Sequence, residues 1–399
     1  MKAVILAAGK STRMYPLTLT KPKHLLKVAG KTILEHNLDA LKGLVDEAII
    51  VVGYKKEMII GFLGKSLEKS YNGIKITYVE QKEQLGTGHA LLQAKSLLTG
   101  RFVFMNGDDI YAKKDIESCL KHKYCLLVKE VTDYEKWGIV TVSGSKVTGV
   151  IEKPGKFVGN LANTQLFVLD QKIFELNLKK SKRGEYEVTD YLTWLAGKET
   201  VNFEAVKEYW LPIGYPWHIL DANEFLLSKL KKSEIKGEVS RQATIAGNVV
   251  VGEGSKILPG VYIEGNVIFG KNCKIGPNCY IRGSTLLGDN CRVGQSVEIK
   301  NSIIGDNSKV PHLSYVGDSV IGENVNFAAG TIVANLRHDQ AGIKTMVNGK
   351  LVDTGRKKFG TVVGDNVHTG INTSIYPGRK LWPNTATIPG EVVKIDKIK

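Results

Sequence analysis

The sequence has no apolar run long enough to span a membrane, and it has few cysteines. No window approaches the ~18 uninterrupted apolar residues that a membrane-spanning helix needs, and Gly9 and Lys10 end the first apolar run. We therefore expect neither a membrane protein nor a secreted one. The five cysteines are an odd number and form no Cys-x-x-Cys pair, which argues against a disulfide framework and a zinc cluster. We expect a cytoplasmic protein.

Signatures of nucleic-acid binding are also lacking, although the chain is basic. It carries 55 Lys and Arg against 40 Asp and Glu, a net charge of +15. Such an excess fits a nucleic-acid binder or a protein that handles phosphorylated small molecules. The basic residues are scattered apart from short clusters at residues 179–183, 229–232 and 356–358, and no zinc-finger or RNP-type motif is present. We expect phosphorylated ligands and no nucleic acid.

The 399 residues are enough for two domains, and the first has an α/β pattern. Up to about residue 230, short apolar runs alternate with amphipathic stretches of helix length. The expected strands are 3–8, 48–53, 74–80 and 102–106, and the expected helices are 33–41 and 89–98. This alternation predicts a mainly parallel sheet. Ligands bind at the carboxyl ends of such strands, so the loops after Leu6, Glu80 and Met105 are the expected site.

From about Val239 the period changes to six residues. The repeating apolar positions are Ile245, Val251, Ile257, Ile263, Phe269, Ile275, Ile281, Leu287, Val293 and Ile299. The register slips by one after Ile299 and again after Val316, and an interruption follows near residues 337–360. A six-residue period predicts short parallel strands stacked into a β-helix. We expect domains at 1–230 and 239–399, joined by a linker at 231–238.

Small residues occupy a second position of the same repeat. The slot four residues after each apolar residue holds Val, Ser, Thr or Cys, and it includes Cys273, Cys279 and Cys291. We expect these three thiols to pack inside the β-helix as small hydrophobic groups rather than to act in redox chemistry.

The loop after the first expected strand combines small residues with cations. Small residues let a polyphosphate approach the backbone, and Lys10 and Arg13 could meet its charge. A Walker loop is excluded, because Gly9-Lys10-Ser11 would need glycine at position 4, where Val4 stands. A dinucleotide-binding fingerprint is not supported either, because Leu91 follows Gly86-Thr87-Gly88 where the third glycine should be.

An ordered set of motifs in this half resembles the sugar-1-phosphate nucleotidylyltransferases. The motifs are residues 7–13 with Pro22-Lys23, 84–88 (Gln-Leu-Gly-Thr-Gly), 106–108 (Asn-Gly-Asp), 138–140 (Gly-Ile-Val), 152–154 (Glu-Lys-Pro) and 184–190 (Gly-Glu-Tyr-Glu-Val-Thr-Asp). The resemblance covers residues 1–225. It implies a doubly wound, Rossmann-like nucleotidyltransferase domain that joins a nucleoside triphosphate to a sugar 1-phosphate and releases pyrophosphate.

The resemblance also implies a role for each matching residue. Arg13 and Lys23 would face the triphosphate, and Asp108 would bind Mg²⁺ with Asp221 or Asn223 as second ligand. The nucleotide contacts would be Ala8, Gly9, Gln81, Gly86 and Thr87, and the sugar contacts would be Gly138, Glu152 and Asn163. The base (UTP or dTTP) and the sugar (glucose, N-acetylglucosamine or a related 1-phosphate) stay open.

The repeat half resembles the acetyltransferase domain of bifunctional enzymes that make UDP-N-acetylglucosamine, and this implies a left-handed β-helix. The matching positions are Arg282, Lys300, His312, Tyr315, Asn326 and Asn335, and of these Asn335, with Ala329, would contact acetyl-coenzyme A. An imidazole titrates near neutral pH, so His312 could take the proton of an amine that attacks a thioester. Arg282, Lys300 and Tyr315 would hold the sugar phosphate, while Asn326 could orient the thioester.

The chain departs from the bacterial pattern after Asn335, where a longer insertion runs through residues 337–358. This form resembles archaeal nucleotidylyltransferases with an acetyltransferase tail. Lys344 is the candidate for a substrate-binding lysine in the insertion, and galactosamine 1-phosphate could serve beside glucosamine 1-phosphate. The family's β-helices trimerise, so the resemblance implies a homotrimer or a multiple of one.

Two other functions remain as alternatives to the bifunctional enzyme. One is a single-activity glucose-1-phosphate uridylyl- or thymidylyltransferase whose β-helix only oligomerises or regulates. The other is a catalytically silent subunit that only binds sugar nucleotides. The presence of Arg13, Lys23 and Asp108, the predicted catalytic and metal-binding residues, speaks against it.

Overall fold

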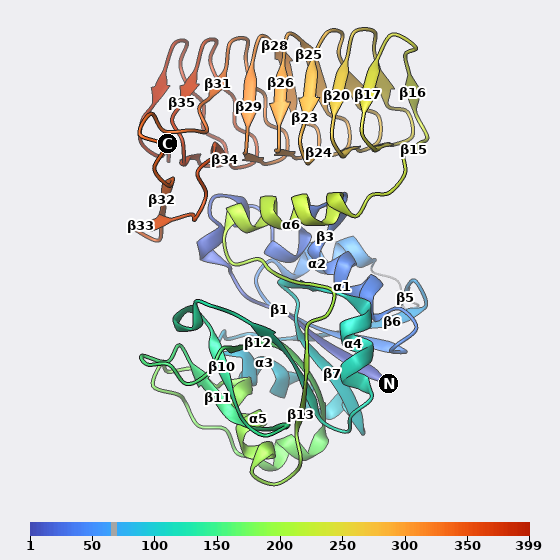
Figure 1. Cartoon of the computed structure of the whole chain (residues 1–399), viewed down its shortest axis with the longest axis vertical. Helices are drawn as coiled ribbons and strands as arrows, with labels where there is room; N and C mark the ends of the chain where they lie inside the picture. The colour runs from blue at the N-terminus through green and yellow to red at the C-terminus, as the bar shows by residue number, and fades with distance from the viewer. Residues whose placement is uncertain (65–69) are drawn as a thin grey trace. The chain divides into compact units, whose positions relative to one another are not determined.

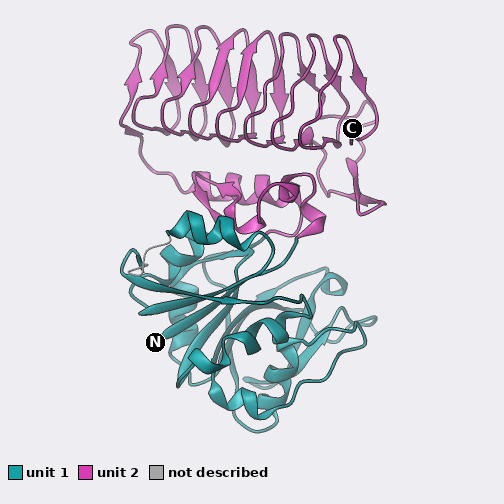
Figure 2. Ribbon diagram, turned by 180° about the vertical axis from the view of Figure 1, so that it is seen from behind, with its two compact units in different colours: residues 1–10, 33–212 teal, residues 11–32, 213–399 magenta. Residues whose placement is uncertain are grey.

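A computed structural model describes residues 1–64 and 70–399. The chain forms two compact units, which are coloured separately in Figure 2. Unit 1 comprises residues 1–10 and 33–212, and unit 2 comprises residues 11–32 and 213–399. The segment 11–32 therefore belongs with the C-terminal repeats. The expected boundaries at 230 and 239 stay a prediction, and the first strand of the repeats, β15 (Glu234–Ile235), lies inside the expected linker.

Unit 1 is built on a mixed sheet with helices packed against it (Figure 1). The strand order is β10-β11-β13-β9-β12-β7-β1-β4-β6-β5. The strands are β1 (Lys2–Ala7), β4 (Glu47–Val52), β5 (Ser70–Tyr71), β6 (Ile74–Glu80), β7 (Arg101–Asn106), β9 (Cys125–Glu130), β10 (Gly138–Ser143), β11 (Lys146–Glu152), β12 (Leu161–Asp170) and β13 (Asn202–Ala205). The helices are α1 (Ile33–Leu41), α2 (Lys56–Leu63), α3 (Thr87–Gln93), α4 (Lys113–Leu120) and α5 (Val188–Ala196). A small ribbon pairs β8 (Asp109–Tyr111) with β14 (Trp210–Pro212).

The parallel part of this sheet agrees with the sequence-based prediction. Strands β7, β1, β4 and β6 are parallel neighbours, so the loops after β1, β6 and β7 leave the same edge of the sheet. The expected helix 89–98 is instead the short helix α3 followed by a 3₁₀ turn at Lys95–Leu97. The rest of the sheet is mixed: β12 runs antiparallel to both β7 and β9, and β10 forms a hairpin with β11. Strand β13 runs parallel to β9.

Unit 2 contains a left-handed parallel β-helix with three sheets along residues 234–393 (Figure 1). The first sheet contains β15 (Glu234–Ile235), β18 (Val249–Val251), β21 (Val267–Phe269), β24 (Thr285–Leu287), β27 (Ile303–Ile304), β30 (Val320–Ile321), β34 (Thr361–Val363) and β36 (Arg379–Leu381). The second contains β16 (Glu238–Val239), β19 (Lys256–Ile257), β22 (Lys274–Ile275), β25 (Arg292–Gln295) and β28 (Lys309–His312). The third contains β17 (Thr244–Ala246), β20 (Tyr262–Glu264), β23 (Tyr280–Arg282), β26 (Glu298–Lys300), β29 (Tyr315–Gly317), β31 (Ile332–Val333), β35 (Ser374–Ile375) and β37 (Val392–Val393).

The interior of the β-helix explains the six-residue period. Each sheet contributes one inward apolar side chain per coil, and the predicted positions from Val251 to Ile299 all lie in one buried core. Cys273, Cys279 and Cys291 are buried beside them, as expected. The register slips mark shorter coils: Leu287 pairs with Ile304, one residue fewer than the step from Phe269 to Leu287.

Two further elements complete unit 2. Helix α6 (Pro216–Ser228) precedes the repeats, and the insertion contains the hairpin of β32 (Lys344–Val347) and β33 (Lys350–Asp353). The segment 11–32 contributes 3₁₀ turns and the short hairpin of β2 (Lys27–Val28) and β3 (Lys31–Thr32). None of the helices found in residues 1–64 and 70–399 has the length and hydropathy of a membrane span.

Candidate functional site

Most of the predicted nucleotide contacts in unit 1 lie together at the sheet edge. The side-chain amide of Gln84 donates to the carbonyl oxygen of Ala8 at 2.8 Å, and that of Gln81 donates to the carbonyl oxygen of Gly86 at 3.1 Å. Gly86 has a φ of +110°, and a Cβ there would lie 2.5 Å from the carbonyl oxygen of Tyr186. Only glycine therefore fits this turn. The hydroxyl of Thr87 accepts the main-chain N–H of Val188 at 3.1 Å, which fixes the loop.

The two predicted catalytic cations lie in the segment 11–32 of unit 2, whereas Gly9 belongs to unit 1. A Cβ at Gly9 would meet no atom within 4 Å, so its backbone is open to a ligand. Arg13 is exposed, and its guanidinium carbon lies 5.1 Å from the ring centroid of Tyr215. Lys23 is only 2% exposed.

The structure distinguishes the two adjacent aspartates after β7. Asp109 is buried, and its Oδ2 accepts the indole N–H of Trp210 at 3.0 Å, which ties β8 to β14. Asp108 is half-buried in the preceding turn. Within the described residues no group of three or more His, Cys, Asp or Glu side chains is arranged to hold a metal ion. The role of Asp108 as a metal ligand stays a prediction.

The two candidates for the second metal ligand lie on α6. Asn223 is fully buried. Its Oδ1 accepts the main-chain N–H of Ala29 at 2.9 Å, and its Nδ2 donates to the carbonyl oxygen of Ser284 at 2.7 Å. Asp221 retains 52% side-chain exposure and forms an ion pair with Arg356. Burial raises the pKa of Asp221, and Arg356 partly offsets this. Asp221 is thus the more accessible of the two, and its metal role stays a prediction.

Two predicted sugar contacts, Gly138 and Glu152, face each other across the hairpin of β10 and β11. A Cβ at Gly138 would lie 2.8 Å from Oε1 of Glu152, so the glycine leaves the space that the carboxylate occupies. Burial is the largest cause of the raised pKa of Glu152, and Arg183 partly offsets it. A desolvated carboxylate in such a slot can accept hydrogen bonds from sugar hydroxyls.

Asn163 on β12 contributes a donor to the same area, because Ala162 beside it pairs with Ile139 of β10. Its Oδ1 accepts the main-chain N–H of Gln165 at 2.9 Å. Its Nδ2 is buried and has no hydrogen-bond partner anywhere in the described chain. Since an unpaired buried donor costs about 1–3 kcal/mol, this amide is poised to bind a ligand acceptor.

The third sheet of the β-helix aligns the predicted sugar-phosphate residues in successive coils. Arg282 of β23 pairs in register with Lys300 of β26, and Glu298 of β26 pairs with Tyr315 of β29. The Arg282 guanidinium donates to Glu298 at 2.7 Å. The phenol of Tyr315 accepts a hydrogen bond from the amide of Asn335 at 3.1 Å, and burial raises its pKa. Four of the predicted residues therefore lie together on one face.

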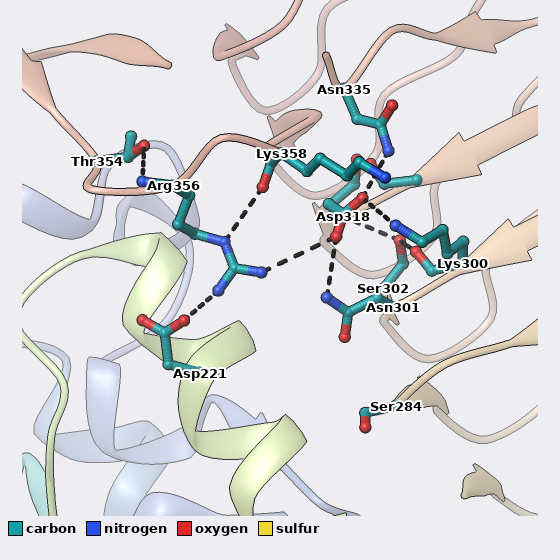
Figure 3. A network of polar contacts seen from close by, with 12 residues as sticks. Asp221, Ser284, Lys300, Asn301, Ser302, Asp318, Asn335, Thr354, Arg356 and Lys358 are labelled. Carbon is teal, nitrogen blue, oxygen red and sulfur yellow. Dashed lines mark hydrogen bonds and ion pairs between the residues drawn. The ribbon is translucent and has the colours of Figure 1, made fainter. Parts of the chain in front are cut away.

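A residue that the sequence reasoning missed, Asp318, is the centre of this cluster (Figure 3). Its carboxylate lies 3.1 Å from Lys300 Nζ, and it accepts the amides of Asn335 at 2.5 Å and Asn301 at 2.9 Å. The side chain is only 3% exposed, so four polar neighbours compensate its charge. The fourth is Arg356, at 3.9 Å.

The insertion places basic side chains next to Lys300, but the expected lysine, Lys344, is not among them. A cavity of about 440 Å³ is lined by Lys300, Asn301, Asp318 and the basic residues 356–358. Arg356 extends between Asp221 and Asp318, and Lys358 extends toward Asn335 (Figure 3). Lys344, the expected lysine, is an exposed residue of β32 and does not line this cavity. The sequence shows the basic cluster 356–358, but it does not show that this cluster lies beside Lys300 and Asp318.

His312 lies at a corner of the β-helix beside Ala329. The main-chain N–H of Gly330 donates to the carbonyl oxygen of His312 at 3.4 Å, so His312 and Ala329 stack in successive coils. The side chain of His312 is exposed at the end of β28. Asn326 lines a different cavity, of about 500 Å³, together with His368 and a row of asparagines.

These features define a nucleotidyltransferase domain followed by an acyltransferase-type β-helix. The Nucleotidyl transferase family matches residues 2–229, and the GMPPB C-terminal domain family matches residues 245–338. The structure of a putative glucose-1-phosphate thymidylyltransferase from Bacillus anthracis is 27% identical with a TM-score of 0.52, over 59% of this chain and 98% of that one.

Two relatives are similar along nearly the whole chain. "Bifunctional protein GlmU" of Methanocaldococcus jannaschii is 43% identical over 96% of this chain and 92% of its own length. The "Bifunctional sugar-1-phosphate nucleotidylyltransferase/acetyltransferase" of Sulfurisphaera tokodaii is 38% identical over 99% and 98%. The chain belongs to this family of bifunctional sugar-1-phosphate nucleotidylyltransferase/acetyltransferases. The single-activity alternative is less supported, since the match to "UTP--glucose-1-phosphate uridylyltransferase AglF" of Haloferax volcanii covers only 54% of the chain.

Proposed function

We propose that the protein N-acetylates glucosamine 1-phosphate and then converts the product and UTP into UDP-N-acetylglucosamine and pyrophosphate. Galactosamine 1-phosphate and glucose 1-phosphate are further candidate acceptors, and dTTP is a candidate nucleotide. The observation that carries this proposal is the alignment of Arg282, Lys300, Tyr315 and Asn335 around Asp318. It is supported by the relative of Sulfurisphaera tokodaii, whose name states both activities and which matches 99% of the chain.

Nucleotidyl transfer requires positioning and charge neutralisation more than a covalent nucleophile. Gln81, Gly86 and Thr87 would hold the nucleotide, and the open backbone at Gly9 would admit the phosphates. Arg13 and Lys23 would neutralise the charge that develops at the α-phosphate. The slot between Gly138 and Glu152 and the unpaired amide of Asn163 would bind the sugar hydroxyls.

Asp108 would hold Mg²⁺, with Asp221 as the candidate second ligand. Mg²⁺ held there would supply positive charge to offset that of the phosphate groups. Asp108 follows β7, at the edge of the sheet where the loops after β1 and β6 also lie.

Acetyl transfer would use the β-helix. The nitrogen of the amino sugar forms a bond with the acetyl carbon, the carbon–sulfur bond of acetyl-coenzyme A breaks, and His312 passes the amine's proton toward the leaving thiolate. Lys300 and Lys358, which line the 440 Å³ cavity, would bind the phosphate dianion together with Arg282, whose strand position pairs in register with Lys300. The backbone at Ala329, stacked on His312, would contact the coenzyme.

A homotrimer would complete this site. Apolar side chains are exposed around the His312 corner: Leu313 is 63%, Ile371 52% and Ile388 70% exposed. An exposed apolar strip beside a candidate catalytic residue is typical of a subunit interface. Sedimentation analysis of the purified protein tests this assembly.

A substrate matrix tests the two activities. UTP and dTTP are each combined with several sugar 1-phosphates, and acetyl-coenzyme A is combined with each amino-sugar phosphate. We expect pyrophosphate release that EDTA abolishes and Mg²⁺ restores, and thiol release that EDTA leaves unchanged. A protein that releases pyrophosphate but no thiol with any amino sugar would have a β-helix without an acetyltransferase role.

Single variants separate the two sites. His312→Ala should lower acetyl transfer about 10²- to 10⁴-fold and spare pyrophosphate release. Asp108→Ala should do the reverse. If Asp108→Ala left pyrophosphate release unchanged, its assignment as a metal ligand would be wrong.

A further inference from the structure

One corner of the β-helix carries a row of carboxylates that neither proposed reaction uses. Asp289, Asp306, Glu323 and Asp365 each follow a glycine, at Gly288, Gly305, Gly322 and Gly364, and we call these four acids the acid ladder. The main-chain N–H of Asp289 donates to Oδ1 of Asp306 at 2.8 Å, and that of Glu323 donates to Oδ1 of Asp365 at 2.8 Å. One oxygen of Asp306 and one oxygen of Asp365 thus cap the previous coil.

Glycine is required in front of these acids. A Cβ at Gly288 would collide with Oδ1 of Asp306, and a Cβ at Gly322 would collide with Oδ1 of Asp365. The small residue in one coil therefore makes room for the carboxylate of the next coil. The acid ladder is a consequence of the glycine positions in the repeat.

Two lysines of the segment 11–32 bind the outer side of the acid ladder. Lys27 Nζ lies 2.8 Å from Oδ2 of Asp306 and 3.6 Å from Asp289, and these acids help to raise its pKa despite its burial. Lys21 forms an ion pair with Glu323 and lies 3.4 Å from Asp365. Its side chain is only 9% exposed, so water screens these pairs weakly.

Hydrogen bonds outside these ion pairs extend the same attachment. The hydroxyl of Thr20 donates to Asp365 at 2.7 Å, and Lys380 Nζ donates to the carbonyl oxygen of Tyr15 at 3.1 Å. Asn348 of the insertion donates to the hydroxyl of Thr12 at 3.1 Å. Contacts from residue 12 to residue 27 therefore fix this segment to several coils.

The attached segment carries Arg13 and Lys23, the two predicted triphosphate contacts. Lys21 and Lys27 flank Lys23 in the sequence but are paired with carboxylates of the β-helix. Lys21 and Lys27 thus anchor the segment that carries Arg13 and Lys23 to the β-helix.

We propose that the acid ladder, through Lys21 and Lys27, positions the segment that carries Arg13 and Lys23 for nucleotidyl transfer. This inference rests on the proposed function. The β-helix then has a second role beyond acetyl transfer, and Lys21 and Lys27 are positioning residues that touch no substrate. Substitutions at this corner of the β-helix change the reaction assigned to the other domain.

The test uses the full-length enzyme and both assays on each preparation. In the double variant Lys21→Met/Lys27→Met we expect kcat for pyrophosphate release to fall about tenfold or more, because misplaced charges stabilise the transition state poorly. The KM for the sugar 1-phosphate should stay within about twofold, because its predicted contacts lie in unit 1. Acetyl transfer should also stay within about twofold. Lys27→Arg should retain nucleotidyl transfer, since it keeps the charge.

A matched control and a reciprocal variant complete the design. Lys256→Met removes an ion pair with Glu238 at 3.2 Å on the β-helix, away from the segment, and should change neither reaction. Glu323→Gln removes a carboxylate partner of Lys21 and should lower kcat for pyrophosphate release in the same direction, even if the double variant is insoluble.

Three results would overturn the positioning role. One is unchanged nucleotidyl kinetics in the soluble double variant and in Glu323→Gln. Another is a parallel loss of both activities, which would indicate general destabilisation. A wild-type enzyme that releases no pyrophosphate would overturn the proposed function itself, and this role with it.

Discussion

The carboxylate of Asp318 lies 3.1 Å from the ammonium group of Lys300, in a position where only 3% of the Asp318 side chain is exposed. The same carboxylate accepts the amide of Asn335, which in turn donates to the phenol of Tyr315. One buried anion therefore holds Lys300, which is expected to bind the sugar phosphate, and Asn335, which is expected to contact acetyl-coenzyme A, and through Asn335 it reaches Tyr315. A φ of +49° at Asp318 turns the chain at this point.

We expect Asp318→Asn to lower kcat/KM for acetyl transfer about tenfold or more. An amide cannot compensate the charge of Lys300, and it offers one acceptor oxygen where the carboxylate offers two. Steady-state kinetics with varied glucosamine 1-phosphate measure the change. Asp339→Asn, which changes an exposed carboxylate that pairs with Arg337 and accepts the main-chain N–H of Ala341, is the control and should have no effect. An unchanged KM and kcat in Asp318→Asn would contradict a positioning role.

Lys358→Gln should raise the KM for the amino-sugar phosphate about tenfold without changing the KM for acetyl-coenzyme A. The reason is that Lys358 lines the cavity beside Lys300 and would add a charge-assisted contact to the phosphate dianion. Lys350→Gln, in the same insertion but exposed on β33, serves as control. If Lys344→Gln raised this KM and Lys358→Gln did not, the sequence-based candidate would be the correct one.

Gly138→Ala should raise the KM for the sugar 1-phosphate in nucleotidyl transfer about tenfold, because its Cβ would lie 2.8 Å from Oε1 of Glu152 and displace the carboxylate. Gly155→Ala is the matched control, since a Cβ there meets no atom within 4 Å. Pyrophosphate release with varied sugar 1-phosphate measures both variants. Equal KM values in the two variants would rule out a role for the pair of Gly138 and Glu152.

We expect the free energy of unfolding to increase as the pH rises above about 8, because Lys380 loses its proton there. Burial lowers the pKa of this lysine from 10.5 to about 8, so between these values the unfolded chain binds more protons than the folded one. The free energy of unfolding therefore increases with pH in this window, by at most about 3 kcal/mol from this group. Below pH 8 the cost of burying the charged amine is fully present.

Urea unfolding at several pH values between 7 and 10 tests this behaviour. Lys380→Met should lack the alkaline increase, so the difference in unfolding free energy between wild type and variant should change with pH. A constant difference would show that Lys380 has the same pKa in the folded and unfolded chains.

Local patterns were sufficient to predict most of the fold. The helix Ile33–Leu41 and the strand Ile74–Glu80 have the bounds expected from apolar periodicity. The six-residue repeat predicted the β-helix, since each coil must bury one side chain per sheet. The antiparallel half of the unit 1 sheet was not predicted, because β12 forms its pairs with strands distant in sequence.

The sequence by itself determined the two architectures, because the periodicity of apolar residues is a local property. The order of its motifs also indicated the reaction expected of each half. Only the tertiary structure decided which charges act together. Lys27 meets Asp306 and Lys300 meets Asp318 because the coils bring these groups together, and no local pattern distinguishes them from the other charged residues. The same holds for segment 11–32, whose membership of unit 2 depends on contacts with residues about 300 positions away.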